Sequence, residues 1–198
     1  MVKTQGRVSE ARSRLLGTAT RIFYTEGIHS VGIDRIVAEA QVTRATLYRH
    51  FAGKEELVLA YLEGVSQLER DQLDQAIAGA DSAADSIRAV AKSITAGITS
   101  DGFRGCAFLN AAAEYPDPEH PVHQAVLAHR DWFATTIATL FTQLGDASPE
   151  PPARHFIMLR DGAMATGCLT DPTQVCETFL QGVEGLLTYR TATTAKPA

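Results

Sequence analysis

A short run of side chains between Thr43 and Arg49 carries hydrogen-bond donors and methyl groups of the kind that nucleic acids bind. An arginine can donate to both O6 and N7 of a guanine in the major groove, and the methyl group of a threonine or alanine can contact that of a thymine. Hydroxyl groups and arginines also donate to phosphate oxygens. The residues expected to face outward are Thr43, Arg44, Ala45, Thr46, Tyr48 and Arg49. An ordinary helical turn with a polar face has the same composition, so the pattern alone leaves both interpretations open.

The elements that must position these side chains are two short helices. The apolar spacing in 33–40 predicts one helix, and Thr43 is a suitable N-cap for a second that runs to His50. A linker of about three residues and a small residue at Ala40 let such helices cross steeply, as in a helix-turn-helix. Lys54 opens the next helix, where free backbone N–H groups also favour a phosphate. The apolar residues that would lock the two helices together are Ile36, Val42 and Leu47.

The charge of the chain divides unevenly. The 198 residues have a net charge of −5, which argues against general binding of polyanions. Residues 1–60, however, hold nine Lys and Arg against six Asp and Glu, which leaves a head of +3 and a remainder of −8. Such asymmetry is a weak indication that the basic part contacts nucleic acid.

Helical periodicity continues along the whole chain, and no segment alternates like a strand. We expect Gly27 to end the first helix and Gly53 to break the helical run after His50. Ser82 is the expected N-cap of the helix that follows it. The expected helices cover about 8–26, 33–40, 43–50, 54–78, 83–99, 105–114, 122–144, 153–169 and 172–189.

The expected location is the cytoplasm, because no signal peptide or membrane-spanning run is visible. The three cysteines are an odd number without C-x-x-C spacing, so we expect neither a disulfide framework nor a thiolate zinc finger.

The stretch from Ile33 to Phe51, followed by Gly53-Lys54-Glu55-Glu56-Leu57, resembles the DNA-binding domain of TetR-family transcriptional regulators, and 19–27 resembles that family's first helix. The resemblance covers about residues 9–62. It implies an all-α fold of nine helices, with an N-terminal helix-turn-helix domain (1–53), a helical ligand-sensing and dimerisation domain (54–190) and a flexible tail (191–198). One departure is Gln41, where the family usually has a glycine; a positive φ there would strain a glutamine mildly.

Residue roles follow from the resemblance position by position. Arg44, Thr46 and Ala45 would face bases, and Phe51 would pack inside. The positions that match the family's phosphate contacts are Thr43, Tyr48, His50 and Lys54. Arg49 could contact a base, contact a phosphate or face solvent, and the resemblance does not decide among these. Arg12 and Arg14 would add electrostatic attraction.

The remaining helices would dimerise and hold an inducer, as the resemblance implies. Small residues at 162, 163, 167, 182 and 185 would let helices approach closely. The expected dimer interface comprises Phe156, Leu159, Ala163, Gly167, Val175, Phe179, Gly182, Val183 and Leu186, although these residues could also fill the core of one chain. The candidate contacts for a small apolar or amphipathic inducer are Phe103, Cys106, Asn110, Glu114, His129, Trp132, Phe133 and Met158.

Three alternatives compete with the inducer. Glu119, His120, His123 and His129 are metal-ligand types, but no second cluster matches them. Cys106, or the pair Cys168 and Cys176 across a turn, could respond to redox conditions. An enzyme is the weakest hypothesis, because no phosphate loop, nucleophile elbow or H-E-x-x-H motif occurs.

The sequence therefore predicts a homodimeric, cytoplasmic DNA-binding regulator without cofactor or metal. We expect it to be a repressor that a small organic inducer releases from a palindromic double-stranded operator.

Overall fold

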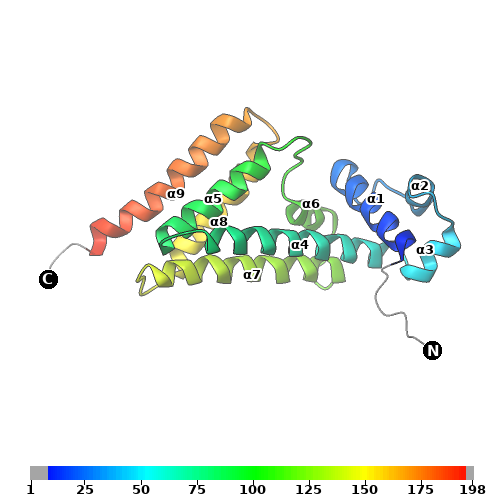
Figure 1. Ribbon diagram of the computed structural model, residues 1–198, viewed down its shortest axis with the longest axis horizontal. Helices are drawn as coiled ribbons and strands as arrows, with labels where there is room; N and C mark the ends of the chain where they lie inside the picture. The colour runs from blue at the N-terminus through cyan, green and yellow to red at the C-terminus, as the bar shows by residue number, and fades with distance from the viewer. Residues whose placement is uncertain (1–8, 195–198) are drawn as a thin grey trace. The chain divides into compact units, whose positions relative to one another are not determined.

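The computed structural model describes the backbone of residues 9–194 and the side chains of residues 9–188. This part of the chain contains nine α-helices and no strand, as predicted (Figure 1). The helices are α1 (Glu10–Glu26), α2 (Ile33–Glu39), α3 (Arg44–His50), α4 (Lys54–Ala78), α5 (Ala83–Ile98), α6 (Ala107–Glu114), α7 (Pro121–Gln143), α8 (Glu150–Thr166) and α9 (Pro172–Thr194).

The largest differences from the predicted boundaries lie in the last two helices. α8 begins three residues early, at Glu150, because Pro151 and Pro152 fall in its first turn, where a backbone N–H has no helical partner to lose. α9 continues to Thr194, so Thr191–Thr194 are helical where a flexible tail was predicted. The rest of that predicted tail, 195–198, lies outside the described residues.

The described chain packs as two compact units. Unit 1 consists of the residues up to Ser66 together with Ala107–Val126, and unit 2 consists of Gln67–Cys106 together with the residues from Leu127 onward. This division differs from the predicted boundary between residues 53 and 54. The reason is that α6 and the first turn of α7 pack with the helix-turn-helix, so that α4 and α7 each contribute to both units.

Unit 1 is built on three short elements that lie against one another, α1, α2 and α3 (Figure 1). α1 buries Leu15, Ala19, Ile22 and Phe23, which recur at helical spacing. The rings of Phe23 and Tyr61 lie 5.9 Å apart and join α1 to α4. From α6, Phe108 and Ala111 are fully buried as well. A large apolar contact area therefore supports α2 and α3, which are too short to be stable alone.

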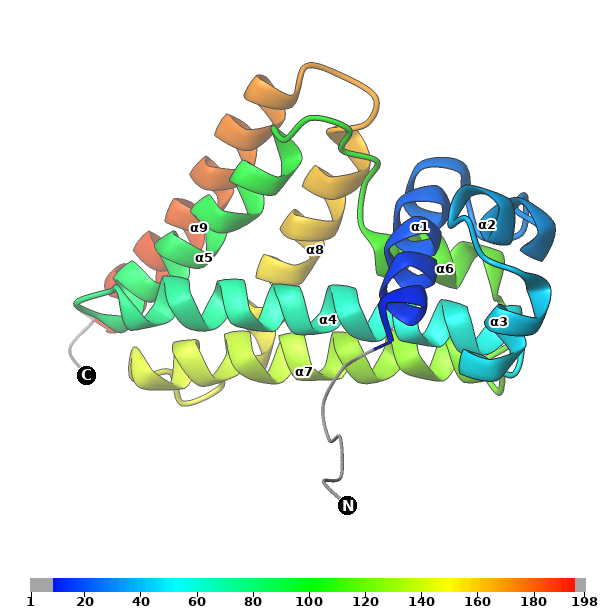
Figure 2. The ribbon, with the colours of Figure 1, turned by 45° about the vertical axis from the view of Figure 1, so that its right-hand side comes forward.

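Unit 2 holds the second core. α9 packs against both α5 and α8, and α5 and α9 run side by side in Figure 2. α5 buries Ile87, Val90, Ala91, Ile94 and Ile98 on one face, and Ser82 caps its first turn by accepting from the backbone N–H of Asp85 at 3.1 Å. The core also contains Ile137, Leu140 and Phe141 of α7. Among the described helices, none combines the length and the apolar character needed to cross a membrane.

Candidate nucleic-acid interface

The turn between α2 and α3 determines how the second helix is presented. The N–H of Val42 donates to the carbonyl of Val37 at 3.0 Å, and the N–H of Gln41 donates to that of Ala38 at 3.1 Å. This pair of hydrogen bonds is a Schellman motif, which requires a left-handed residue at the position of Gln41. Gln41 has φ 53°, so the expected departure from glycine is accommodated with a positive φ. The backbone hydrogen bonds and buried neighbours hold the turn despite the mild strain.

α3 is fixed at its start and from beneath. The Thr43 hydroxyl accepts from the backbone N–H of Thr46 at 3.1 Å, which confirms Thr43 as the N-cap. Of the three residues of the predicted lock, Ile36 and Leu47 are completely buried, whereas Val42 is only half-buried. Ala40, the small residue at the crossing, is nearly fully buried. Phe51 is buried too, in agreement with a packing role. The fixed inner face of α3 leaves its opposite face to solvent.

The predicted DNA-contacting residues lie on that outer face or at its ends. Thr43, Arg44, Ala45, Tyr48 and Arg49 are exposed, whereas Thr46, His50 and Lys54 are half-buried. Burial lowers the pKa of Lys54 from its ordinary value, while the nearby Glu114 carboxylate acts in the opposite direction. One helix face and the adjoining start of α4 thus gather the donors that the sequence indicated.

Arg44 has a partner that sequence reasoning missed. Its Nε and Nη2 atoms donate to the two carboxylate oxygens of Asp34, each at 2.5 Å. This ion pair raises the pKa of Arg44 above its ordinary value, so the guanidinium stays charged. The positions of the two residues could have indicated this pair, because Asp34 and Arg44 occupy the first turns of two helices that must cross.

Other basic residues of the head are engaged away from α3. Arg35 donates to Glu39 at 2.8 Å and to Glu26 at 2.7 Å, and Arg21 also pairs with Glu39. The Arg12 guanidinium lies over the ring of Phe51, 5.0 Å from its centroid. These pairs leave the net charge of +3 unchanged, since that sum already counts Glu26 and Glu39, but they engage Arg21 and Arg35 within the head.

Comparison with known proteins agrees with this geometry. Residues 15–61 match the family model for bacterial regulatory proteins of the tetR family. A TetR-family transcriptional regulator from Streptomyces coelicolor, whose crystal structure is known, is 66% identical. The match covers 91% of this chain and 95% of that one, with a TM-score of 0.89.

This chain belongs to the TetR family. It is thus a transcriptional regulator, and its relatives support a DNA-binding role without catalysis.

Curated members of the family are more distant. The HTH-type transcriptional regulator LmrA of Bacillus subtilis is 25% identical over 126 residues, which are 62% of this chain and 67% of LmrA. The HTH-type transcriptional activator FasR of Mycolicibacterium smegmatis is 43% identical over 54 residues. That match spans only 27% of this chain and 25% of FasR, so it is confined to a part the size of the DNA-binding head.

The predicted inducer contacts separate into different places. Cys106, His129 and Phe133 are buried in unit 2, with Phe103 and Trp132 partly buried beside its core. Asn110 is exposed on α6 in unit 1. Met158 is 72% exposed on α8 and lines a surface groove. The structure therefore does not bring the eight residues together as one lining.

Glu114, one of the predicted inducer contacts, binds the backbone of the loop after α1. Its carboxylate accepts from the backbone N–H groups of Ile28 at 2.8 Å and His29 at 2.5 Å. These two groups follow the end of α1, where Gly27 has φ 91°. Glu114 thus joins α6 to the loop that leads into the helix-turn-helix.

A buried ionic cluster in unit 2 also escaped prediction. Arg160 of α8 is only 4% exposed. Its guanidinium donates to Asp161 at 3.0 Å, to Glu69 at 3.5 Å and to the Cys106 sulfur at 3.4 Å. Burial acts to lower the pKa of Arg160, but Cys106, Glu69 and Asp161 together raise it by more. The pKa therefore lies above its ordinary value, and the guanidinium remains charged. Its position between Phe156 and Ala163 on the apolar stripe of α8 was the signal in the sequence.

Around this cluster lie the predicted histidine and aromatic residues. His129 Nε2 is 3.2 Å from a Glu69 carboxylate oxygen, and the Arg160 guanidinium lies 5.1 Å from the centre of the Phe133 ring. The Nε of Arg160 is buried without a hydrogen-bond partner. A buried donor of this kind is costly unless something accepts from it.

The predicted dimer residues divide into three groups. The side chains of Phe156, Ala163, Val175, Phe179 and Val183 are buried in the core of their own chain. A Cβ at Gly167 would lie 2.8 Å from an atom of Ile98, and one at Gly182 would lie 3.1 Å from Leu159. These two glycines therefore serve close packing within one chain. Leu159 and Leu186 are partly buried against the same core.

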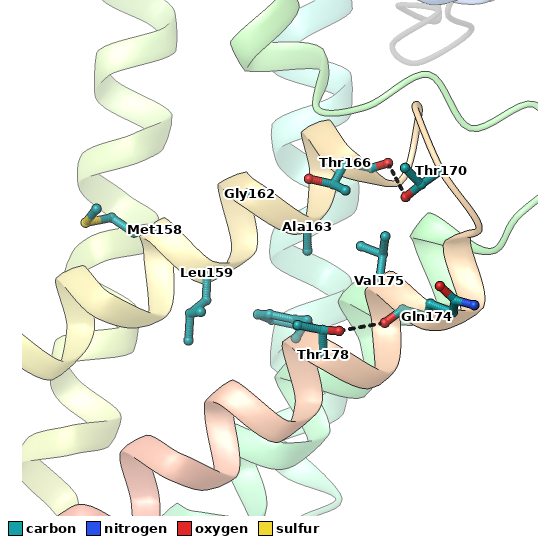
Figure 3. A pocket seen from close by; sticks show the side chains of 10 residues that line it. Met158, Leu159, Gly162, Ala163, Thr166, Thr170, Gln174, Val175 and Thr178 are labelled. Atoms are coloured by element: carbon teal, nitrogen blue, oxygen red, sulfur yellow. Dashed lines mark hydrogen bonds between the residues drawn. The ribbon is translucent and has the colours of Figure 1, made fainter.

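The surface between α8 and α9 contains an exposed groove of about 390 Å³ (Figure 3). The hydroxyls of Thr170 and Thr178 donate to the carbonyls of Thr166 and Gln174, as the dashed lines in Figure 3 show. These hydroxyls are satisfied within the chain, so the groove needs no polar partner there. Its lining residues are Met158, Leu159, Gly162, Ala163, Thr166, Thr170, Gln174, Val175, Thr178 and Phe179.

The groups considered for metal or redox responses are dispersed. Across the described residues, no three His, Cys, Asp or Glu side chains are placed to hold a metal ion. His120 Nδ1 accepts from the N–H of Val122, and His123 contacts the Tyr115 carbonyl. Cys106 and Cys176 are buried, and Cys168 is exposed.

Proposed function

We propose that this regulator is a repressor that binds a palindromic operator as a homodimer and leaves it when a small organic ligand binds unit 2. The observation that carries the DNA-binding part is the presentation of α3. A Schellman turn, an N-cap and a buried Leu47 hold the helix, while Arg44, Tyr48 and Arg49 face solvent. In this proposal α3 enters the major groove, as recognition helices of this motif do.

The roles along α3 follow from its geometry and from the family. Arg44, with Thr46 and Ala45, reads base edges, while Thr43, Tyr48, His50 and Lys54 hold phosphates. Arg49 contacts a base edge or a phosphate, or stays in solvent. Phosphate contacts fix the position of the protein on the duplex, whereas base contacts give the sequence preference.

The test is a selection of bound sequences from random double-stranded DNA, followed by mobility-shift titrations. A palindromic consensus is expected, because the two heads of a dimer bind half-sites about 34 Å apart or a multiple of that spacing. Tyr48→Phe should weaken binding to all sequences alike, and Arg44→Ala should also relax one base position by about 1–3 kcal/mol. If no sequence is enriched, the proposal of an operator is refuted. If Tyr48→Phe and Arg44→Ala both bind with the affinity of wild type, the assigned roles are refuted.

We place the dimer contact on the groove face of α8 and α9. A Cβ added at Gly162 or Gly185 would meet nothing within 4 Å on the chain itself, so the small size of these residues serves no packing within it. Two copies of this face would form an isologous four-helix interface. Gel filtration with light scattering of Met158→Asp should yield a monomer, and an unchanged dimer would move the interface elsewhere.

The ligand is proposed to be small and amphipathic, because the core of unit 2 combines aromatic side chains with the charged Arg160 cluster. Ligand binding would favour a dimer whose heads no longer match two half-sites, and a preference of several kcal/mol would make the switch effective. A thermal-shift screen of amphipathic compounds, followed by operator release, tests this step. A promoter-reporter assay tests repression, since FasR among the relatives is an activator. Cytoplasmic location is part of the same proposal.

A further inference from the structure

The ion pair between α2 and α3 has a specific geometry. Asp34 stands in the first turn of α2 and Arg44 in the first turn of α3. The carboxylate accepts from Nε and from Nη2, so it occupies the lateral edge of the guanidinium. The terminal edge, formed by Nη1 and the second N–H of Nη2, is not used by this contact.

The unused edge has the donor spacing that a guanine requires. An arginine grips O6 and N7 of a guanine with two parallel N–H groups, and the terminal edge supplies such a pair. An arginine held by its lateral edge can thus bind a carboxylate and a guanine at once. The same side chain without a holder samples many rotamers and reaches phosphates as readily as bases, because its long chain is flexible.

We propose that Asp34 is a specificity-determining positioning residue, which holds Arg44 so that its terminal guanidinium edge meets a guanine in each half-site. The inference rests on the proposed binding of α3 to the major groove. It adds a residue outside α3 to the determinants of sequence preference, and it assigns guanine as the base that Arg44 reads.

Stability does not explain the pair. Asp34 and Arg44 are 71% and 62% exposed, and ion pairs this exposed contribute little to folding. A carboxylate on the face that meets DNA also repels phosphates, so it opposes overall affinity. A role in orienting the arginine accounts for a negative charge at this place, since orientation increases discrimination between bases without requiring tighter binding.

The experiment compares base preference rather than affinity alone. Wild type, Asp34→Ala and Asp34→Asn are titrated against the selected operator and against operators with the guanine replaced at the Arg44 position in both half-sites. Glu10→Ala is the matched control, because it removes one exposed carboxylate from the same unit beside another arginine. Circular dichroism melting checks that each variant folds.

Wild type should prefer guanine by about tenfold to a hundredfold. Asp34→Ala should lower that ratio at least threefold while non-specific affinity stays equal or rises. Asp34→Asn retains one acceptor oxygen and should lie between the two. Glu10→Ala should keep the wild-type ratio. In an Arg44→Ala background, Asp34→Ala should leave the already weakened preference unchanged.

Two results would overturn the inference: an unchanged guanine preference in Asp34→Ala, or the same loss of preference in the absence of Arg44. A wild-type selection that enriches guanine nowhere in the half-site would overturn it as well. Failure of the proposed function has a different signature, since wild type would then select no sequence at all.

Discussion

Removal of the Glu114 carboxylate tests the connection between α6 and the helix-turn-helix. Glu114→Ala deletes the acceptor for the N–H groups of Ile28 and His29, at 2.8 and 2.5 Å. Hydrogen bonds to a charged group contribute about 1.5–3 kcal/mol each. The Glu114 side chain is 24% exposed and His29 is on the surface, so water replaces part of the loss. We therefore expect the loop to open more easily by about 2–3 kcal/mol in total.

The assay is amide hydrogen exchange, which reports local opening at the two donors directly. A cost of about 2–3 kcal/mol corresponds to exchange that is faster by roughly thirtyfold to a hundred-and-fiftyfold, at a factor of ten per 1.4 kcal/mol. Glu114→Gln keeps one acceptor oxygen and should show an intermediate increase. Glu119→Ala, which removes an exposed carboxylate from the same unit, is the control for charge. Exchange at Ile28 and His29 that matches this control within twofold would refute the assigned role of Glu114.

Three further predictions concern folding. Gln41→Gly should stabilise the chain by about 0.5–1 kcal/mol in urea unfolding, because glycine adopts φ 53° without strain; a destabilised variant would show that the turn is unstrained. Gly167→Ala should lower the melting temperature, since its Cβ would lie 2.8 Å from a side chain of α5, whereas Gly97→Ala, whose Cβ would meet nothing within 4 Å, should not, and a reversed order would contradict the packing. Glu184→Gln should lose the ion pair with Arg88, which holds the pKa of Glu184 below its ordinary value of 4.5. That contribution is present above pH 4.5 and disappears as the pH falls through the lowered pKa, so urea midpoints of variant and wild type should converge in acid but differ at pH 7.

Local features were predictable because their causes lie within a few residues. Thr43 and Ser82 cap their helices by accepting from backbone N–H groups only three positions away. Gly27 ends α1 because a residue with a positive φ is needed there. The apolar periodicity of 33–50 predicts which side of α3 is buried, and the outer face follows from it. These are the features on which the helix-turn-helix assignment depends.

Long-range partners were not predictable in the same way. The sequence offered Glu114 only as one of several candidate inducer contacts, and nothing near it in the chain indicated a contact with the backbone after α1. Its partner Ile28 lies 86 positions away. Arg160 contacts Glu69 from a distance of 91 positions and Cys106 from 54. Such pairs arise from the packing of helices, and helical periodicity contains no information about which helices meet.

The α8 and α9 surface shows the same limit. The sequence identified small and apolar residues there but could not tell core from interface, because both require the same residue types. Packing assigns Gly167 and Gly182 to contacts within the chain and leaves Gly162 open.

The sequence by itself thus determined the family, the all-α class and the residues of the recognition helix, since local spacing and capping encode these properties. Tertiary structure decided which polar groups meet, and the proposed base preference depends on one such pair, Asp34 with Arg44. Two residues ten positions apart become an ion pair only when a turn crosses their helices.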